Sequence, residues 1–226
     1  MPSTAGRRVI TLGIVLAALA IVASLIGWPV RTADHPDVLL ITLDTTRADR
    51  LGCYGYAGAR TPAIDAIAAS GGLVEHAFTP APITLPSHPT LFTSKLPPEH
   101  GIRVNGENGL PRDVPVLAEI LRDAGYRTGA FVSASVLNGI FGLDRGFEAH
   151  DDTMSRQGGG HDESIRERRA DSAVDAALAW LEAQKEGPYF CWVHLFDPHL
   201  PYEPPEPKPG EHPHDGEIEV RVRGDG

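Results

Sequence analysis

The sequence predicts an α/β domain built on a mostly parallel sheet with helices on both faces. Short apolar runs of strand length alternate along the chain with segments of helical period, and strands separated by helices are typical of a parallel sheet covered on both sides. Residues 38–43 form an apolar run without polar alternation, as expected for a strand buried on both faces. We therefore expect 38–43 to be the central strand.

The other elements are predicted in chain order. A helix should begin at Thr61-Pro62, since proline is favoured at the first helical position, and end at Gly71-Gly72. The apolar residues Ile64, Ile67 and Ala68 would lie on one face of this helix. The later predictions are a strand at 73–78, a helix at 116–124 closed by Gly125, a strand at 127–133, a polar mobile loop at 155–169, a helix at 170–184 and a strand at 189–196. The helix at 170–184 carries an expected buried stripe of Val174, Leu178 and Leu181.

Chemistry is expected at one edge of this sheet, because ligands collect at the carboxyl ends of parallel strands. Asp44 directly follows the first strand, and His194, Asp197 and His199 surround the end of the last. The topology would bring these side chains to the same edge. His194 lies inside the strand pattern and is interpreted as a packing residue.

Composition limits the classes of function. The chain has 226 residues and 42% apolar residues, which suffices for one large domain. Its net charge of -10 argues against a nucleic-acid groove, which needs clustered Lys and Arg. An anionic substrate would instead have to be met by a metal ion. Cys53 and Cys191 cannot form a disulfide framework, and we interpret both as structural.

An apolar run at 9–30 follows Arg7 and Arg8 and is long enough to span a membrane as a helix. Positive charge before the run predicts a cytoplasmic n-region at 1–8 and an extracytoplasmic domain on the periplasmic or extracellular face. A cleaved signal peptide is the alternative, although the run offers no clear cleavage site. We predict an uncleaved anchor.

Thr84 lies in the proline-bracketed run 82–90 and is the candidate nucleophile. A hydroxyl attacks poorly unless a base or a metal ion removes its proton, and the carboxylate of Asp44 could hold such an ion. The structural alternative is a surface threonine in a turn. The sequence pairs Thr84 with Asp44 as nucleophile and metal ligand.

The chain resembles the sulfatase branch of the alkaline phosphatase superfamily over about residues 37–219. In that branch a Cys or Ser nucleophile is followed by one residue, then Pro-Ser-Arg and later Thr-Gly, where this chain has Thr84, Pro86-Ser87-His88 and Thr93-Ser94. Further matching segments in family order are 44–52, 61–62, 99–102, 125–128 and 197–202. The resemblance implies a metal-dependent hydrolase of sulfate or phosphate esters that uses Ca, Mg, Mn or Zn.

Three departures from the family pattern affect the chemistry. A threonine cannot become the formylglycine of sulfatases, so Thr84 would act as an alkoxide, as the resemblance implies for phosphodiesterases and for phosphoglycerol- or phosphoethanolamine-type transferases. The Gly-Lys-Trp-His run that grips sulfate is replaced by residues 131–135. Thr45 also occupies the place of a second metal-binding Asp. These differences favour phosphorus esters.

The resemblance assigns further roles. Asn105 matches an Asn that donates to a non-bridging ester oxygen, with a plain Asn-Gly turn as its alternative. His199 matches the His of a Pro-His-x-Pro stretch that contacts the esterified group. His88 replaces the signature Arg and would either orient Thr84 or fill the loop. The implied substrate is a small-molecule, glycan or lipid ester.

Family members carry a second set of metal ligands, usually an Asp-His or Asp-Asn pair, beyond the position of Gly226. We therefore expect residues 37–219 to be the N-terminal part of a catalytic domain about twice as long, inactive alone, with an atypical tail at 220–226. The non-enzyme alternative is a degenerate, membrane-anchored sulfatase-like module.

Overall fold

The computed structural model describes residues 35–106, 108–154, 156–157, 166–184 and 187–200, and residues 202, 209, 214 and 218. Residues 37–226 form one compact unit, distinct from residues 1–36. The predicted anchor at 9–30 and the tail at 220–226 lie outside the described residues. No helix within the described ranges is long and apolar enough to cross a membrane.

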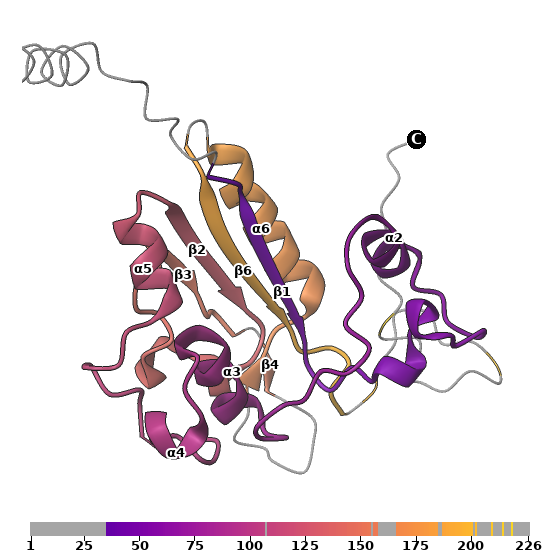
Figure 1. Ribbon diagram of the computed structural model, residues 1–226, viewed down its shortest axis with the longest axis horizontal. Coiled ribbons are helices and arrows are strands. Elements are labelled where there is room, and N and C mark those ends of the chain that lie inside the picture. The colour runs from indigo at the N-terminus through magenta and orange to yellow at the C-terminus, as the bar shows by residue number, and fades with distance from the viewer. Residues whose placement is uncertain are drawn as a thin grey trace, which may run out of the picture. The chain divides into compact units, whose positions relative to one another are not determined.

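The predicted parallel sheet is confirmed. Four strands lie in the order β1 (Val38–Leu43), β6 (Tyr189–Leu195), β2 (Arg127–Val132) and β3 (Ala149–Asp151), and every pairing is parallel (Figure 1). A second sheet pairs β4 (Arg156–Gln157) antiparallel with β5 (Arg166–Glu167). These two short strands lie in the segment predicted as a loop, whose Gly158–Gly160 run falls outside the described residues.

The prediction that 38–43 is the central strand is wrong for the sheet described here. β6 lies between β1 and β2, so β1 is at the edge. Leu39 and Ile41 pair with Cys191 and Val193 on the same face, yet both are about half exposed because α6 (Ala170–Ala183) packs on β2 and β6 instead. The apolar run correctly indicated a strand but not its position.

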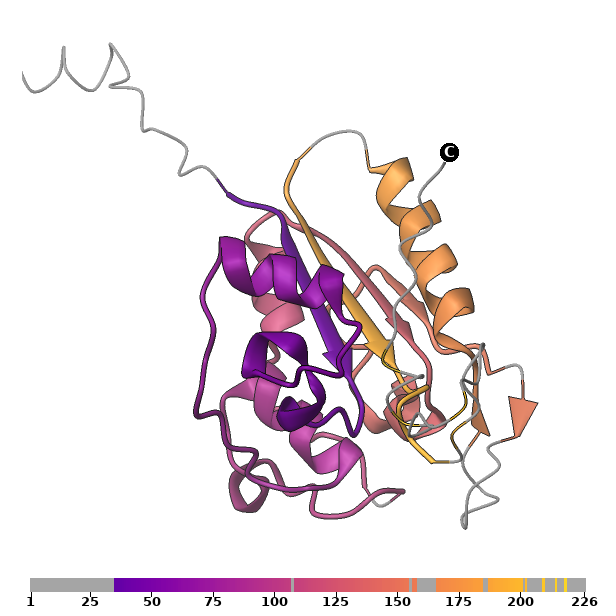
Figure 2. The same ribbon diagram turned by 90° about the vertical axis from the view of Figure 1, so that its right-hand side faces the viewer.

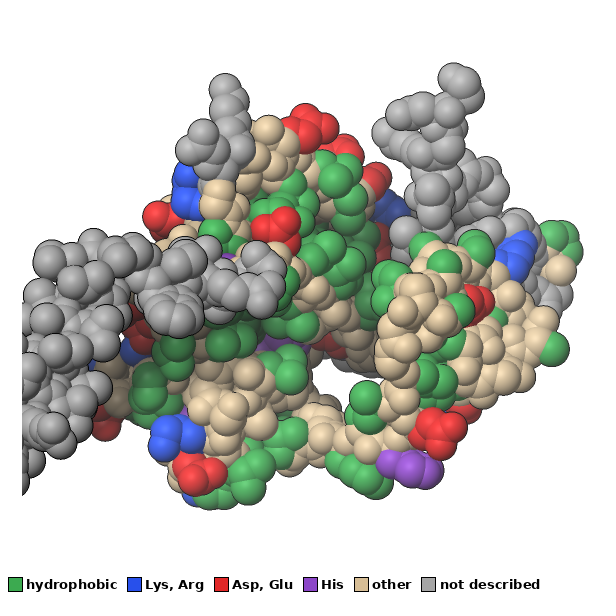
Figure 3. Space-filling view, turned by 45° about the horizontal axis from the view of Figure 1, so that its top comes forward, with side chains coloured by type: hydrophobic (Ala, Val, Ile, Leu, Met, Phe, Trp, Pro, Cys, Tyr) green, Lys and Arg blue, Asp and Glu red, His purple; other side chains and the backbone are tan. Residues whose placement is uncertain are grey.

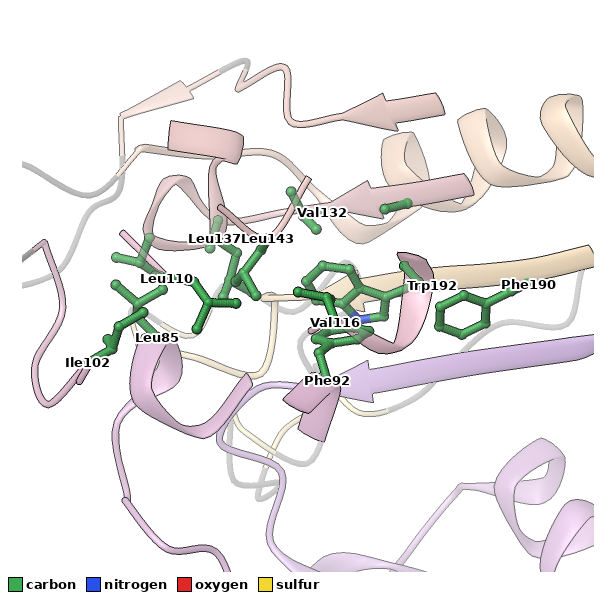
Figure 4. Packing of buried hydrophobic residues seen from close by; sticks show 14 of the residues in the cluster. Leu85, Phe92, Ile102, Leu110, Val116, Val132, Leu137, Leu143, Phe190 and Trp192 are labelled. Atoms are coloured by element: carbon green, nitrogen blue, oxygen red, sulfur yellow. The ribbon is translucent and has the colours of Figure 1, made fainter. Parts of the chain in front are cut away.

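Helices cover both faces of the sheet, as predicted (Figures 1 and 2). On one face Phe190 and Trp192 pack with residues of α3 (Thr84–Thr93) and α5 (Leu117–Asp123). On the other face Cys191 and Val193 pack with residues of α6. Successive side chains of a strand point to opposite faces, so β6 supplies both cores. Figure 4 shows Trp192 in the larger core beside Phe92 and Val116.

Three details of the helices and strands differ from prediction. Of the predicted stripe of α6, Val174 and Leu181 are partly buried against the core, whereas Leu178 is 51% exposed and the fully buried positions are Ala173 and Ala177. Helix α2 (Pro62–Ser70) begins and ends as predicted but has no buried residue. No strand forms at 73–78, where Phe78 is 90% exposed. An apolar segment becomes a strand only where a partner strand accepts its hydrogen bonds.

The remaining elements are short. They are helix α4 (Pro97–His100) and the 3₁₀ helices η1 (Ala48–Arg50), η2 (Gly52–Tyr54), η3 (Ser135–Leu137) and η4 (Gly139–Phe141). Most of them lie in the connections beyond the carboxyl ends of β1 and β2, where the site residues also occur. Hydrophobic side chains are interspersed with polar ones on the face of the molecule in Figure 3.

Candidate active site

Thr84 and Asp44 are in direct contact. Thr84 is the first residue of α3, and its hydroxyl donates to Asp44 Oδ2 over 2.9 Å. Asp44 follows β1, and its backbone N–H donates to Leu195 O at the end of β6. The sheet therefore holds the backbone of Asp44, and Thr84 lies at a helix N-terminus. The structure joins the two residues that the sequence paired across 40 positions.

Most of the proline-bracketed run 82–90 is the helix α3, and not the turn of the structural alternative. Ile83 is extended, and Thr84 begins the helix. Pro86 lies in the first turn, where a missing N–H costs no hydrogen bond. Pro89 lies further inside the same helix. Leu85, Pro86 and His88 are buried, which anchors the segment that carries Thr84.

Thr45 turns the chain immediately after Asp44. Its φ is 49°, which is unusual for a β-branched residue and costs roughly 1–3 kcal/mol. The Thr45 hydroxyl donates to Pro198 O over 2.8 Å and so ties this turn to the loop after β6. Thr45 thus supplies a structural hydrogen bond in the turn that follows Asp44.

His88 supports the backbone of Thr84. Its Nδ1 lies 2.7 Å from Thr84 O, and because a carbonyl only accepts, Nδ1 carries the proton. Burial lowers the pKa of His88, although the Thr84 hydrogen bond and the charge of Asp44 act in the opposite direction. A neutral imidazole therefore contacts the backbone of Thr84. Of the two alternatives for His88, the contact supports orientation of Thr84.

His194 lies against Asp44, a contact that its interpretation as a packing residue did not include. The side chain is buried in β6, with Nε2 3.7 Å from Asp44 Oδ2 and Nδ1 2.9 Å from Thr42 Oγ1. Burial holds the pKa of His194 well below its usual range, and the neighbouring His88 lowers it further. The two histidine rings meet edge to face at 5.0 Å.

Asn105 is joined to the nucleophile helix. Its Oδ1 accepts from the backbone N–H of Leu85, the residue after Thr84, over 2.9 Å. Because a backbone N–H must donate to oxygen, this bond assigns the Oδ1 and Nδ2 atoms of the Asn105 amide. The side chain is exposed, so Nδ2 remains as a hydrogen-bond donor. The geometry places a donor one residue from the candidate nucleophile.

Asp197 and His199 are engaged elsewhere. Asp197 Oδ2 accepts from the backbone N–H of Ala170 over 2.6 Å, at the first residue of α6. His199 stacks on Phe196 at 4.4 Å, and its Nδ1 lies 2.8 Å from Leu200 O. Of the residues around the end of β6, the structure therefore brings His194 to Asp44, whereas Asp197 caps a helix.

The sulfatase family profile matches residues 36–219, which is most of the chain. The chain belongs to the sulfatase family. This agrees with the parallel α/β sheet and with the Asp44–Thr84 contact at its carboxyl edge.

Curated relatives of this sulfatase-family chain include arylsulfatase A of Bos taurus, 35% identical over 102 residues, or 43% of this chain and 20% of the relative. The delta 4,5-hexuronate-2-O-sulfatase of Bacteroides thetaiotaomicron is 24% identical over 185 residues, or 78% of this chain and 37% of the relative. The chain thus spans well under half the length of these relatives.

Solved structures share the fold. The phosphonate monoester hydrolase of Agrobacterium radiobacter superposes with a TM-score of 0.60 and 24% identity, covering 76% of this chain and 43% of that one. The C-terminal periplasmic domain of EcEptC from Escherichia coli, a complex with Zn, gives a TM-score of 0.58 and 16% identity over 83% of this chain and 57% of that one.

Sulfatase-family proteins are generally metal-dependent, and Asp44 and Thr84 fit part of a site for a hard cation. They offer two oxygen atoms 2.9 Å apart, the ligand type that Mg²⁺ and Ca²⁺ prefer. The Asp44 side chain is only 7% exposed, and a buried carboxylate requires a cation or hydrogen-bond donors. Among the described residues no cluster of three or more His, Cys, Asp or Glu could hold a metal ion.

Buried neutral histidines should make this sulfatase domain acid-sensitive. Burial lowers the pKa of His150 below its ordinary value of 6.5, against the opposing charge of Asp152. Below pH 6.5 such a histidine binds a proton in the unfolded chain but stays neutral in the folded chain. The free energy of unfolding therefore falls by up to about 1.4 kcal/mol per pH unit for each such group. We expect the unfolding temperature to drop between pH 7.5 and 5.5.

Two single variants separate this effect from other causes. His150→Gln should reduce the loss of unfolding temperature on acidification, because one buried imidazole is removed. The matched control is His76→Gln, at an exposed histidine, which should leave the pH dependence unchanged. Equal pH profiles for His150→Gln and the unmodified protein would contradict the prediction.

Proposed function

We propose that this domain is the nucleophile-bearing part of a metal-dependent ester hydrolase in which Thr84 attacks a phosphorus or sulfur ester, with phosphorus esters favoured. The observation that carries the proposal is the 2.9 Å contact between Thr84 Oγ1 and Asp44 Oδ2. It aligns a hydroxyl with a carboxylate that can accept its proton or share a cation with it. This is the arrangement that an alcohol nucleophile requires.

The reaction would proceed in two displacements. Thr84 Oγ1 forms a bond to phosphorus, its proton leaves by way of the Asp44 carboxylate to solvent, and the leaving alcohol departs with the electron pair of the broken ester bond and takes up a proton. Water or a second alcohol then displaces Thr84 and restores its hydroxyl. A divalent cation bound by Asp44 and Thr84 would favour ionisation of the hydroxyl and neutralise charge on the ester oxygens.

Asn105 would stabilise the charge that develops in these displacements. The Leu85 N–H holds the amide oxygen, which leaves Nδ2 as a preorganised donor beside the attacking group. Such a donor contributes roughly 3 kcal/mol when it is aimed at an oxygen that gains charge. His88, through Thr84 O, keeps the backbone of the nucleophile in place.

Two features favour phosphorus over sulfur. Threonine cannot be oxidised to the aldehyde that sulfatases use, so Thr84 must form a simple covalent ester. Ser133, in the segment where sulfatases carry the sulfate-gripping run, is fully buried, and its short side chain cannot reach a substrate oxygen at the surface. One of the proteins that share the fold is a phosphonate monoester hydrolase, which supports the proposal of phosphorus chemistry.

Turnover of two aryl esters by the intact protein that carries this chain tests the proposal. An aryl phosphodiester should be hydrolysed, EDTA should stop the reaction, and a divalent cation should restore it. Faster turnover of the matched aryl sulfate would overturn the preference for phosphorus. If neither ester is hydrolysed when the cation is present, the proposal that the protein is an enzyme is contradicted, and a binding module of sulfatase fold is favoured.

A further inference from the structure

A line of buried polar groups runs beneath Asp44. β1 and β6 are neighbouring parallel strands in which Thr42 pairs with His194 and Leu40 with Trp192 (Figure 1). The side chains of Thr42, Trp192 and His194 therefore lie on one face of the sheet. Trp192 Nε1 donates to Thr42 Oγ1 over 3.1 Å, and Thr42 Oγ1 lies 2.9 Å from His194 Nδ1.

These contacts, taken together with the nearby carboxylate of Asp44, favour one tautomer of His194. The indole N–H of Trp192 can only donate, so Thr42 Oγ1 is an acceptor in that bond. The hydroxyl proton of Thr42 can then be donated to His194 Nδ1, which lies 2.9 Å from Thr42 Oγ1. With the proton on Nε2, Nδ1 accepts from the Thr42 hydroxyl and the Nε2–H faces Asp44 Oδ2, whereas the other tautomer would turn a lone pair toward the carboxylate. We therefore assign the proton of the neutral imidazole to Nε2.

The protonated nitrogen faces the carboxylate. His194 Nε2 is buried, makes no hydrogen bond to any residue that the structure describes, and lies 3.7 Å from Asp44 Oδ2. Buried polar atoms are nearly always paired, and an orphan in a native site calls for an explanation. Hydrogen bonds between site residues are often long before substrate binds and shorten afterwards.

We propose that His194 is a positioning residue, whose Nε2–H orients the carboxylate of Asp44 toward the hydroxyl of Thr84. The proposal rests on the proposed function of the Asp44–Thr84 pair. A neutral donor fixes the carboxylate without adding positive charge next to it. Thr42 and Trp192 contribute indirectly to the orientation of Asp44, because they hold the His194 imidazole in the required tautomer and orientation. Outer groups of this kind typically change metal affinity or activity by about 10- to 100-fold when they are replaced.

The tautomer itself can be measured without any assay of activity. Long-range ¹H–¹⁵N spectra of the folded protein should show His194 protonated on Nε2 and unprotonated on Nδ1 at neutral pH. Thr42→Val removes the hydroxyl that donates to Nδ1 and should shift the His194 signals. A His194 that is protonated on Nδ1 in the unmodified protein would overturn the proposal whether or not the protein hydrolyses esters.

Kinetics of the same protein test the consequence. His194→Phe keeps a ring of similar size but removes the donor, so kcat for the aryl phosphodiester should fall at least about tenfold, with little change in KM. His194→Gln, which can place an amide N–H near the position of Nε2, should recover most of that loss. The matched control His100→Gln, at a buried histidine paired with Thr90, should leave kcat unchanged.

The outcomes separate the two proposals. An active unmodified protein with an unchanged kcat in His194→Phe overturns the positioning role but leaves the function standing. An inactive unmodified protein overturns the function, and the tautomer spectrum then still decides on the geometry. A purely structural role would lower the unfolding temperature of His194→Phe and His194→Gln alike, with no recovery of kcat by glutamine.

Discussion

Thr84→Ala is expected to abolish ester hydrolysis by the intact protein, with a loss of about 10⁴-fold or more. The variant lacks Thr84 Oγ1, the proposed attacking atom, which donates to Asp44 Oδ2. No covalent ester can then form. Initial rates with the aryl phosphodiester measure the loss. Mass spectrometry of acid-quenched protein should find a phosphorylated peptide around Thr84 in the unmodified protein and not in the variant.

Two further variants establish that the loss comes from the nucleophile. Thr84→Ser keeps a hydroxyl in the same place and should retain measurable turnover and the covalent ester. Thr93→Ala removes a hydroxyl from the last position of the same helix, where it donates to Pro89 O, and should leave the rate unchanged. If Thr84→Ala hydrolysed the ester as fast as the unmodified protein, the assignment of Thr84 would be rejected.

The contact between Asp44 and Thr84 could be anticipated because its two parts leave separate signals in the sequence. The carboxylate follows an apolar strand, and ligands gather where parallel strands end. The hydroxyl stands in a run that resembles a family's nucleophile segment. Neither sequence signal specifies the distance between the carboxylate and the hydroxyl, but a parallel sheet leaves few ways to arrange the two segments. The structure then places the two oxygens 2.9 Å apart.

The role of His194 could not be anticipated in the same way, because it depends on strand register. Thr42 and His194 are 152 positions apart and become neighbours only when β1 and β6 pair in one particular register. A shift of one residue would turn His194 to the opposite face of the sheet. Sequence patterns indicate that a histidine lies in a strand but not which side chain stands beside it.

The misplaced elements have a related cause. The apolar run of β1 and the segment 73–78 both have the composition of a strand, yet composition does not indicate which strand, if any, pairs with them. β1 pairs with β6 and is a strand, whereas Phe78 and its neighbours are exposed and irregular. In α6 the buried positions are the small Ala173 and Ala177, because a helix that packs closely on a sheet needs small side chains at the contact. A search for large apolar residues chose Leu178 instead.

Gly146→Ala is expected to destabilise the domain strongly, by about 3–5 kcal/mol of unfolding free energy. Gly146 has a φ of 84°, and a Cβ there would overlap the backbone of Ala118 and Glu119 in α5. That backbone cannot retreat easily, because Glu119 is held by Arg145 over 2.9 Å and Gly146 O accepts from Thr128 Oγ1 over 2.7 Å. Equilibrium urea unfolding followed by circular dichroism measures the change.

Gly55→Ala is the matched control for this prediction. Gly55 also has a positive φ, of 94°, but a Cβ there would meet no atom within 4 Å. The control therefore carries the cost of the left-handed backbone alone, about 1 kcal/mol. The difference between the two variants isolates the steric overlap, which depends on the close approach of the loop before β3 to the start of α5. An equal decrease in unfolding free energy in both variants would show that the backbone near Gly146 moves aside without an energetic cost. That result would contradict the close packing on which the prediction depends.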